Sequence, residues 1–228
     1  MKLLALDTAT EACSAALLVG EAMHARFEVL GRGHAERLLP MVDELLHEAG
    51  CALAELDAIA FGRGPGAFTG VRIAVSIAQG LALGSGLPLV PVSDLRALAA
   101  AALAKTPVEH ALACLDARMG EVYWAHARRE ASLGCELLAE GLARPEDVPA
   151  PAAGAVAAGH GFSAYPALGE RFGPGLVACW PDLLPDAATI ARLAVFEVRA
   201  GRTVRATAAE PVYLRNDVAT RSTRRPGA

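Results

Sequence analysis

Residues 61–72 read Phe61-Gly62-Arg63-Gly64-Pro65-Gly66-Ala67-Phe68-Thr69-Gly70-Val71-Arg72. This glycine-rich segment follows an apolar run at 57–61, which predicts a strand, and precedes an apolar stretch at 71–83, which predicts a helix. Backbone amides at the start of a helix can bind an anion, so a phosphate loop is one interpretation. It is not favoured, because a Walker loop needs a Lys after its last glycine and the glycines space as GxGxxxG instead of GxGxxG. A tight turn that begins a helix also explains the glycines.

The chain before this segment predicts three strands and a helix. Apolar runs at 3–7, 13–19 and 24–30 are typical of an antiparallel meander. From His34 onward apolar residues recur on one face, which predicts an amphipathic helix that Gly50 ends. A strand at 89–92 follows the helix at 71–83, so the order of the first half is β-β-β-α-β-α-β.

The second half of the chain repeats this theme. Strands are predicted near 111–115, 122–127, 135–139, 156–158 and 176–179, and a helix at 187–199 completes the set. We therefore expect an α/β protein of two similar lobes, 1–105 and 106–228, each with a mixed five-stranded sheet flanked by helices. This is the plan of the actin-like ATPase fold, also called ribonuclease H-like, in which a cleft between the lobes holds nucleotide phosphates.

Composition and charge exclude several classes of protein. Hydrophobic residues make up 54% of the 228 residues and charged residues 20%, so the chain is expected to fold. A net charge of −4 gives no general basic field for RNA, and any RNA contact is expected to be local or shared with a partner. The one basic cluster is terminal, with Arg221, Arg224 and Arg225 in a predicted solvated tail, for which a return to the first lobe is one expectation.

The location predicted from the sequence is the cytoplasm. The apolar run at the N-terminus is too short for a signal peptide. Ser76 and Gln79 interrupt the best candidate for a membrane span. The five cysteines form no CxxC pair, so neither a disulfide framework nor a zinc ribbon is predicted.

Several segments, in order along nearly the whole chain, resemble the bacterial TsaB family, also called YeaZ. They are Leu4-Ala5-Leu6-Asp7-Thr8, Gly33-His34-Ala35-Glu36, the segment 61–72 with Gln79-Gly80-Leu81-Ala82, Asp116-Ala117-Arg118 with Glu121-Val122-Tyr123, and Glu210-Pro211-Val212-Tyr213-Leu214-Arg215. The resemblance implies a dimerisation subunit for tRNA threonylcarbamoyladenosine modification of the adenosine next to the anticodon. It also implies a sister subunit, TsaD, which performs the transfer, an ATPase, TsaE, a homodimer, and contact with tRNA only within the complex.

The sequence predicts no catalytic residue, no metal site and no cofactor. In the sister TsaD two histidines four residues apart hold a metal, and here His34 has Leu38 at that separation. Asp7 and Thr8 stand where actin-like kinases bind phosphate, but Ala9 replaces a close-packed glycine. With Asp116 and Gly159 they predict at most a vestigial nucleotide cleft. The alternative is a free-standing actin-like small-molecule kinase, with Asp7 and Asp116 around magnesium, or a metallopeptidase.

The two predicted helices of the first lobe are candidates for a subunit interface. Between 71 and 83 the strongly polar side chains are Arg72, Ser76 and Gln79, so apolar groups lie on all sides of that helix. Small residues recur every fourth position and allow another helix to approach closely. The predicted interface residues are His34, Leu38, Val42, Leu45, Gly70, Ala74, Ala78 and Ala82. Burial inside the lobe is the other interpretation. The hypothesis is a non-catalytic scaffold that binds and activates TsaD.

Overall fold

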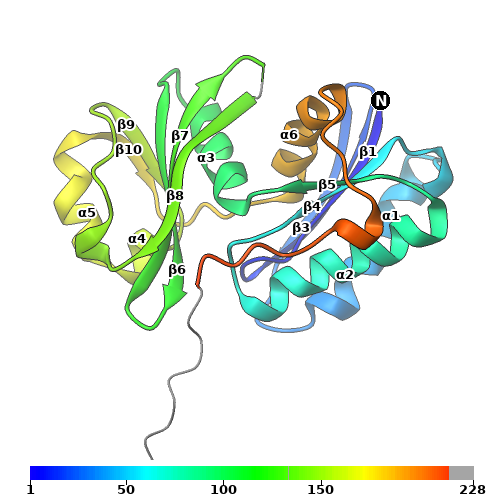
Figure 1. The fold of residues 1–228 in the computed structure, drawn as a ribbon, viewed down its shortest axis with the longest axis horizontal. Helices are drawn as coiled ribbons and strands as arrows, with labels where there is room; N and C mark the ends of the chain where they lie inside the picture. The colour runs from blue at the N-terminus through cyan, green and yellow to red at the C-terminus, as the bar shows by residue number, and fades with distance from the viewer. Residues whose placement is uncertain (133, 216–228) are drawn as a thin grey trace, which may run out of the picture.

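A computed structural model describes residues 1–132 and 134–215, so the basic cluster 221–225 and its predicted return to the first lobe lie outside the described residues. The chain forms two five-stranded sheets (Figure 1), ordered β3-β2-β1-β4-β5 and β10-β9-β6-β7-β8. The first contains β1 (Lys2–Asp7), β2 (Ala12–Val19), β3 (Ala22–Val29), β4 (Ala58–Gly62) and β5 (Leu89–Val92). The second contains β6 (His110–Arg118), β7 (Glu121–Glu130), β8 (Gly134–Ala143), β9 (Ala155–Ala158) and β10 (Leu176–Trp180).

The two sheets have the same topology. In the first, β1, β2 and β3 pair antiparallel, and β4 and β5 join in parallel. In the second, β6, β7 and β8 form the meander, and β9 and β10 are the parallel pair. The predicted repeat of two mixed five-stranded sheets in an actin-like α/β fold is confirmed.

Helices cover the sheets in three layers. α1 (His34–Glu48) and α2 (Phe68–Ser85) lie on the outer side of the first sheet. α4 (Gly161–Ala164) and α5 (Pro166–Phe172) lie on the outer side of the second (Figure 1). Between the sheets lie α3 (Asp94–Ala104) and α6 (Ala187–Arg199). Short 3-10 turns occur at Leu53–Glu55, Pro145–Asp147, Gly173–Gly175 and Ala206–Ala208.

The sequence did not predict α3, and its position explains why. Ser93 caps the helix by accepting a hydrogen bond from the Arg96 N–H at 3.4 Å. Most of its residues are buried because it packs on β6 and β7 and against α6, and its less buried positions are mainly alanines, so no amphipathic period appears. Conversely, α6 packs on β1, β2 and β4. Since each of these helices covers the sheet of the other segment, the division into 1–105 and 106–228 stays a proposal.

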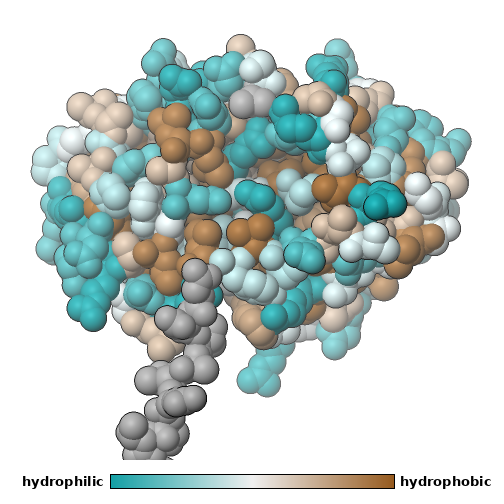
Figure 2. Space-filling view, viewed as in Figure 1, coloured by the Kyte–Doolittle hydropathy of each residue, from teal (hydrophilic) through white to brown (hydrophobic). Residues whose placement is uncertain are grey.

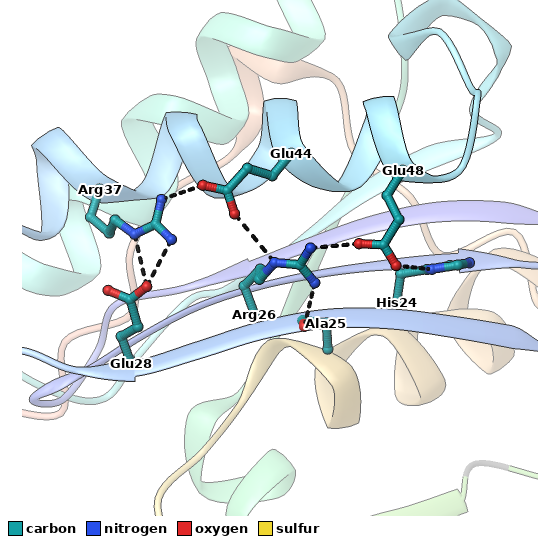
Figure 3. A network of polar contacts seen from close by, with 7 residues as sticks. All are labelled: His24, Ala25, Arg26, Glu28, Arg37, Glu44 and Glu48. Atoms are coloured by element: carbon teal, nitrogen blue, oxygen red, sulfur yellow. Dashed lines mark hydrogen bonds and ion pairs between the residues drawn. The ribbon is translucent and has the colours of Figure 1, made fainter.

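A polar network holds α1 to the edge strand β3 (Figure 3). Arg26 on β3 contacts Glu44 and Glu48 of α1 at 3.2 and 2.5 Å, and Arg37 on α1 reaches Glu28 of β3 at 2.7 Å. Each side chain is partly exposed, so the individual pairs contribute little, about 0–1 kcal/mol each. Together they fix the side of α1 that faces β3 and leave its outward side free.

The last described segment links the two lobes. Val204 pairs with Leu89 at the edge of β5 through two backbone hydrogen bonds of 2.8 Å. The Val212 N–H then donates to the Arg63 carbonyl at 2.7 Å. Arg215 reaches the second lobe, where it pairs with Glu121 at 2.7 Å.

In the view of Figure 1, hydrophilic and hydrophobic residues are mixed over the surface of the molecule (Figure 2).

Among the described residues, α2 alone is long and apolar enough to cross a membrane by length and composition. The expectation from the sequence that no such run exists is therefore corrected. The core helix of a globular protein passes the same test, and the side of α2 that faces the first sheet is buried in the core. Its Gln79 side chain also donates to the carbonyls of Ala206 and Ala209 at 3.2 and 2.9 Å.

Candidate functional site

The glycine-rich segment folds back onto the end of β1. The Ala67 N–H donates to the Ala9 carbonyl at 2.7 Å, and the Thr8 hydroxyl donates to the Gly70 carbonyl at 2.7 Å. A Cβ at Gly66 would overlap the backbone of Ala9, and one at Gly70 would overlap the Thr8 carbonyl. The glycines therefore permit close contact between two parts of the chain.

Asp7 and Asp94 form a buried carboxyl pair beneath this segment. Neither has exposed surface. Asp7 Oδ1 accepts the Ala9 N–H at 2.9 Å, and Asp94 Oδ2 accepts the Gly64 N–H at 2.5 Å. Within the described chain, Asp7 Oδ2 and Asp94 Oδ1 are buried without another hydrogen-bond donor. Protonation of one carboxyl would supply a donor to the other.

Burial governs the ionisation of this pair. Burial raises the pKa of Asp7 well above its ordinary value, and the charge of Asp94 raises it further. Burial also raises the pKa of Asp94 to about 7, although the Gly64 amide favours its ionised form. A protonated pair closed off from solvent is a poor ligand for a magnesium ion or a nucleotide. Neither carboxyl is open to solvent at this strand end.

In the second lobe, Asp116 belongs to a separate, partly exposed cluster. Its carboxylate accepts the Tyr165 hydroxyl at 3.0 Å and the Arg118 N–H at 2.7 Å. Its own N–H donates to His160 Nδ1 at 3.0 Å, which leaves the proton of the neutral ring on Nε2. That atom lies 3.6 Å from Glu11 of the first lobe. Burial lowers the pKa of His160, and Glu11 partly opposes the change.

The predicted cleft residues therefore do not assemble into one site. Asp7 and Thr8 are sealed beneath the glycine-rich segment, and Asp116 lies in the polar cluster. Gly159 has φ +106°, and a Cβ there would overlap the Cys114 carbonyl. The absence of a side chain at position 159 therefore allows close packing against β6. The sequence analysis did not identify Asp94, although Asp94 comes just after β5 in the same way that Asp7 ends β1. It did not identify Glu11 either, because no local sequence pattern marks that residue.

The predicted interface residues of α1 and α2 require a correction. The buried cores of the two helices contain Leu38, Val42, Leu45, Gly70, Ala74, Ala78 and Ala82. These side chains pack against the first sheet and are not available to another subunit. The prediction that they form an interface is wrong. His34 is partly exposed and remains a prediction.

The outward side of α2 carries a second row of small residues, Ser76, Gly80 and Gly84, all exposed. Position 76 lies two residues from 74, a rotation of about 200° around the helix, so the two rows point in opposite directions. The sequence shows both rows but not which one meets the sheet. Val71 and Val75 beside the inner row fill the core and decide the choice.

Exposed apolar side chains flank this outward row. Phe68 and Leu83 of α2 are 59% and 68% exposed, and Leu39 of α1 is 47% exposed. A groove of about 340 Å³ lies between Ala35 of α1 and Ile73 of α2. Exposed apolar groups around a groove mark an interaction surface. We call this surface, formed by the outward sides of α1 and α2, the outer helical face.

Known proteins resemble the chain over both lobes. The family model described as "TsaD: tRNA N6-adenosine threonylcarbamoyltransferase" matches residues 20–163. The tRNA threonylcarbamoyladenosine biosynthesis protein TsaB of Escherichia coli is 45% identical over 96% of this chain and 96% of its own length. The TsaB of Haemophilus influenzae is 43% identical over 96% of this chain and 95% of its own.

Solved structures agree with these relatives. YeaZ from Pseudomonas aeruginosa has a TM-score of 0.86 at 46% identity and covers 93% of this chain and 99% of its own. A second structure, described as an uncharacterized protein with similarity to peptidase YEAZ from Pseudomonas aeruginosa, has a TM-score of 0.87 at 47% identity. It covers 94% of this chain and 99% of its own. The likeness therefore extends over both sheets and the helices between them.

Proposed function

This chain belongs to the TsaB family of tRNA threonylcarbamoyladenosine biosynthesis proteins, and from that premise we propose that it is the non-catalytic, partner-binding subunit of the pathway. Its role in tRNA threonylcarbamoyladenosine biosynthesis follows from the family. The proposal adds that it binds and activates a TsaD-like transferase through its outer helical face and works with a TsaE-like ATPase. It also forms a homodimer, meets tRNA only within the complex, and acts in the cytoplasm.

The observation that carries the non-catalytic role is the sealed end of β1. An actin-like catalyst needs an open strand end where phosphates and metal can approach the first-lobe Asp. Here Asp7 and Thr8 have no exposed surface, and Gly66 and Gly70 lie directly against the backbone of residues 8–9. Opening this contact would break the Ala67 and Thr8 hydrogen bonds together. The fold of a nucleotide-binding protein is kept, while its phosphate site is filled by the chain.

The outer helical face supports the binding role. Its large apolar side chains, Phe68, Leu83 and Leu39, lie beside exposed small residues. Burying such side chains in a contact is worth about 1.5–3 kcal/mol each before the costs of association. Small residues let a partner helix approach the α2 backbone closely. This combination suits a helix-on-helix contact.

The test is reconstitution with a purified transferase subunit, the ATPase, tRNA and the threonylcarbamoyl donor. The proposal expects no modification without this chain and saturation at one copy per transferase. Asp7→Asn combined with Asp116→Asn should give the wild-type rate, with circular dichroism as a control for folding. If the double variant folds, binds the transferase and yet abolishes modification, the non-catalytic role is wrong.

The match to the transferase family model favours a second candidate, in which this chain performs the transfer itself. Among residues 1–132 and 134–215, no three His, Cys, Asp or Glu side chains are grouped to hold a metal ion. Modification by this chain without a sister subunit would favour the second candidate. Calorimetry with ATP and magnesium on the isolated chain tests the remaining alternative, a free-standing kinase, which requires binding and turnover.

A further inference from the structure

Residues 204–215, which we call the strap, cross from the first lobe to the second. The carbonyls of Ala206 and Ala209 accept hydrogen bonds from the Gln79 side chain of α2 at 3.2 and 2.9 Å. Ala206 and Ala209 are also the buried residues of the strap, and the side chain of each is a single methyl group. A segment that buries little apolar surface can detach at a lower cost in free energy than unfolding of the whole chain. The strap is therefore an element that can be released while the lobes stay folded.

At its far end the strap holds the turn between β6 and β7 through Arg215. The Arg215 guanidinium pairs with Glu121 at 2.7 Å. It also donates to the carbonyls of Ala117 and Arg118 at 3.0 and 3.4 Å. These two carbonyls belong to the peptide units on either side of Arg118. One side chain of the strap thus fixes the orientation of two consecutive peptide units in the turn.

The turn that Arg215 holds has a costly conformation. Arg118 and Met119 have φ angles of +63° and +57°. The left-handed region is unfavourable for residues that carry a Cβ, and such residues persist where their surroundings hold them. Packing of the side chains does not supply this hold, because the Arg118 side chain is 87% exposed and Met119 is 80% exposed. The hold therefore comes from hydrogen bonds of the turn, among them those that Arg215 donates.

The turn is joined to a contact between the lobes at Asp116. The Asp116 carboxylate accepts the Arg118 N–H at 2.7 Å, and the Asp116 N–H donates to His160 Nδ1 at 3.0 Å. Nε2 of the same ring lies 3.6 Å from Glu11 of the first lobe. A continuous series of contacts therefore runs from Arg215 through the turn to the first lobe.

We propose that the strap is a releasable clasp that couples α2 to the β6–β7 turn and to the contact between His160 and Glu11. While the strap is bound, Arg215 keeps the turn left-handed. When the strap detaches from α2, Arg215 withdraws, the turn relaxes, and Asp116 no longer holds the His160 ring toward Glu11. The coupling is a difference in free energy between two states, so it acts in both directions. It goes beyond the proposed function, because it is a property of the isolated chain.

The strap also contributes to the outer helical face. The ring centroids of Tyr213 and Phe68 lie 5.8 Å apart, and the Arg72 guanidinium lies over both rings. Tyr213 is exposed, as Phe68 is. A partner that covers these two rings together would select the state in which the strap is bound, and would thereby stabilise the turn in the second lobe.

The test is hydrogen exchange of the backbone amides, measured on the whole isolated chain. Gln79→Met removes the two hydrogen bonds to the strap and keeps a side chain of similar length. It should raise the exchange rates of the amides at 117–121 about fivefold or more. Arg215→Ala should raise the same rates, and the two changes combined should act as one, because each releases the same element. Ser76→Ala on α2 and Arg205→Ala on the strap, both at exposed positions, are the matched controls and should change these rates less than about twofold.

Three results would overturn the inference. Unchanged rates at 117–121 in Gln79→Met, with raised rates in Arg215→Ala, would show that Arg215 acts on the turn without the rest of the strap. Unchanged rates in both variants would show that Arg215 does not hold the turn. An equal rise at every amide, including those of the buried strand β1, would show a loss of global stability instead of release of the strap. None of these measurements requires a partner, so the clasp and the proposed function can fail separately.

Discussion

The two sides of α2 carry similar residues in opposite surroundings. Inward lie Gly70, Ala74, Ala78 and Ala82, and outward lie Ser76, Gly80 and Gly84. A Cβ at Gly70 would overlap the Thr8 carbonyl, whereas one at Gly80 would meet no atom within 4 Å. The small residues on the inner side of α2 therefore permit a contact within the chain, whereas those on the outer side leave space above the helix. We interpret the inner side as the contact that closes the end of β1 and the outer side as the proposed docking surface.

The largest effect is expected from a charge placed on the inner side. Ala78→Glu should lower the free energy of unfolding by about 4 kcal/mol or more, because the carboxylate would be buried without a partner. Ser76→Glu, two residues away and exposed, should change it by no more than about 0.5 kcal/mol. Urea denaturation measures both. Equal effects would mean that the two sides do not differ as described.

A smaller effect is expected from adding a methyl group to each side. Gly70→Ala should destabilise the fold by about 1–3 kcal/mol, because the chain must move away from Thr8. Gly80→Ala should stabilise it by about 0.5–1 kcal/mol through helix propensity. Thermal unfolding of the two variants under one condition makes the comparison. A stable Gly70→Ala protein would show that the loop is not tightly sealed.

The carboxyl pair beneath the seal predicts a dependence of stability on pH. Because the pKa values of Asp7 and Asp94 are raised in the folded state, the native protein binds more protons than the unfolded chain. This contribution is complete below about pH 4, the unfolded value, and is lost as pH rises through about 7. The slope is at most about 1.4 kcal/mol per pH unit for each proton.

Asp94→Asn tests this dependence. Asparagine keeps an acceptor for the Gly64 N–H and donates to Asp7 without a shared proton. The free energy of unfolding should therefore depend less on pH, and at pH 8 it should be higher than in the wild-type protein. Asp182→Asn, an exposed acid of the second lobe, is the control and should leave the curve unchanged. Denaturant midpoints from pH 4 to 8 provide the measurement. An unaltered slope in Asp94→Asn would contradict the shared proton.

Local patterns in the sequence predicted most of the fold. The strand at 89–92 and the helix at 187–199 are found at the predicted residues, and the other predicted strands are located with small differences at their ends. The helix α3 was missed because the second sheet and α6 cover it, which removes the polar side that identifies a surface helix. The structure departs from the prediction there and at the short outer helices α4 and α5, which the sequence analysis also did not predict.

The candidate site was less predictable because it depends on distant residues. Asp7 and Asp94 each stand at or just after the end of a strand, which is an ordinary position for an aspartate. They come together only because β1 and β5 lie on either side of β4 in the folded sheet. The rows of small residues on α2 were both visible in the sequence, but their directions depend on how Val71 and Val75 pack. Spacing indicates which residues share a side of a helix, and packing decides which side is covered.

The most direct test compares one change on each side in the reconstituted tRNA modification reaction. Gly80→Arg alters the outer helical face without touching the core, and Asp7→Asn alters the sealed cleft while keeping its acceptor for Ala9. With all subunits near the wild-type dissociation constant, Gly80→Arg should lower the initial rate at least tenfold and recover at high concentration. Asp7→Asn should match the wild-type rate. A normal rate for Gly80→Arg together with a lost rate for a folded Asp7→Asn protein would contradict the account.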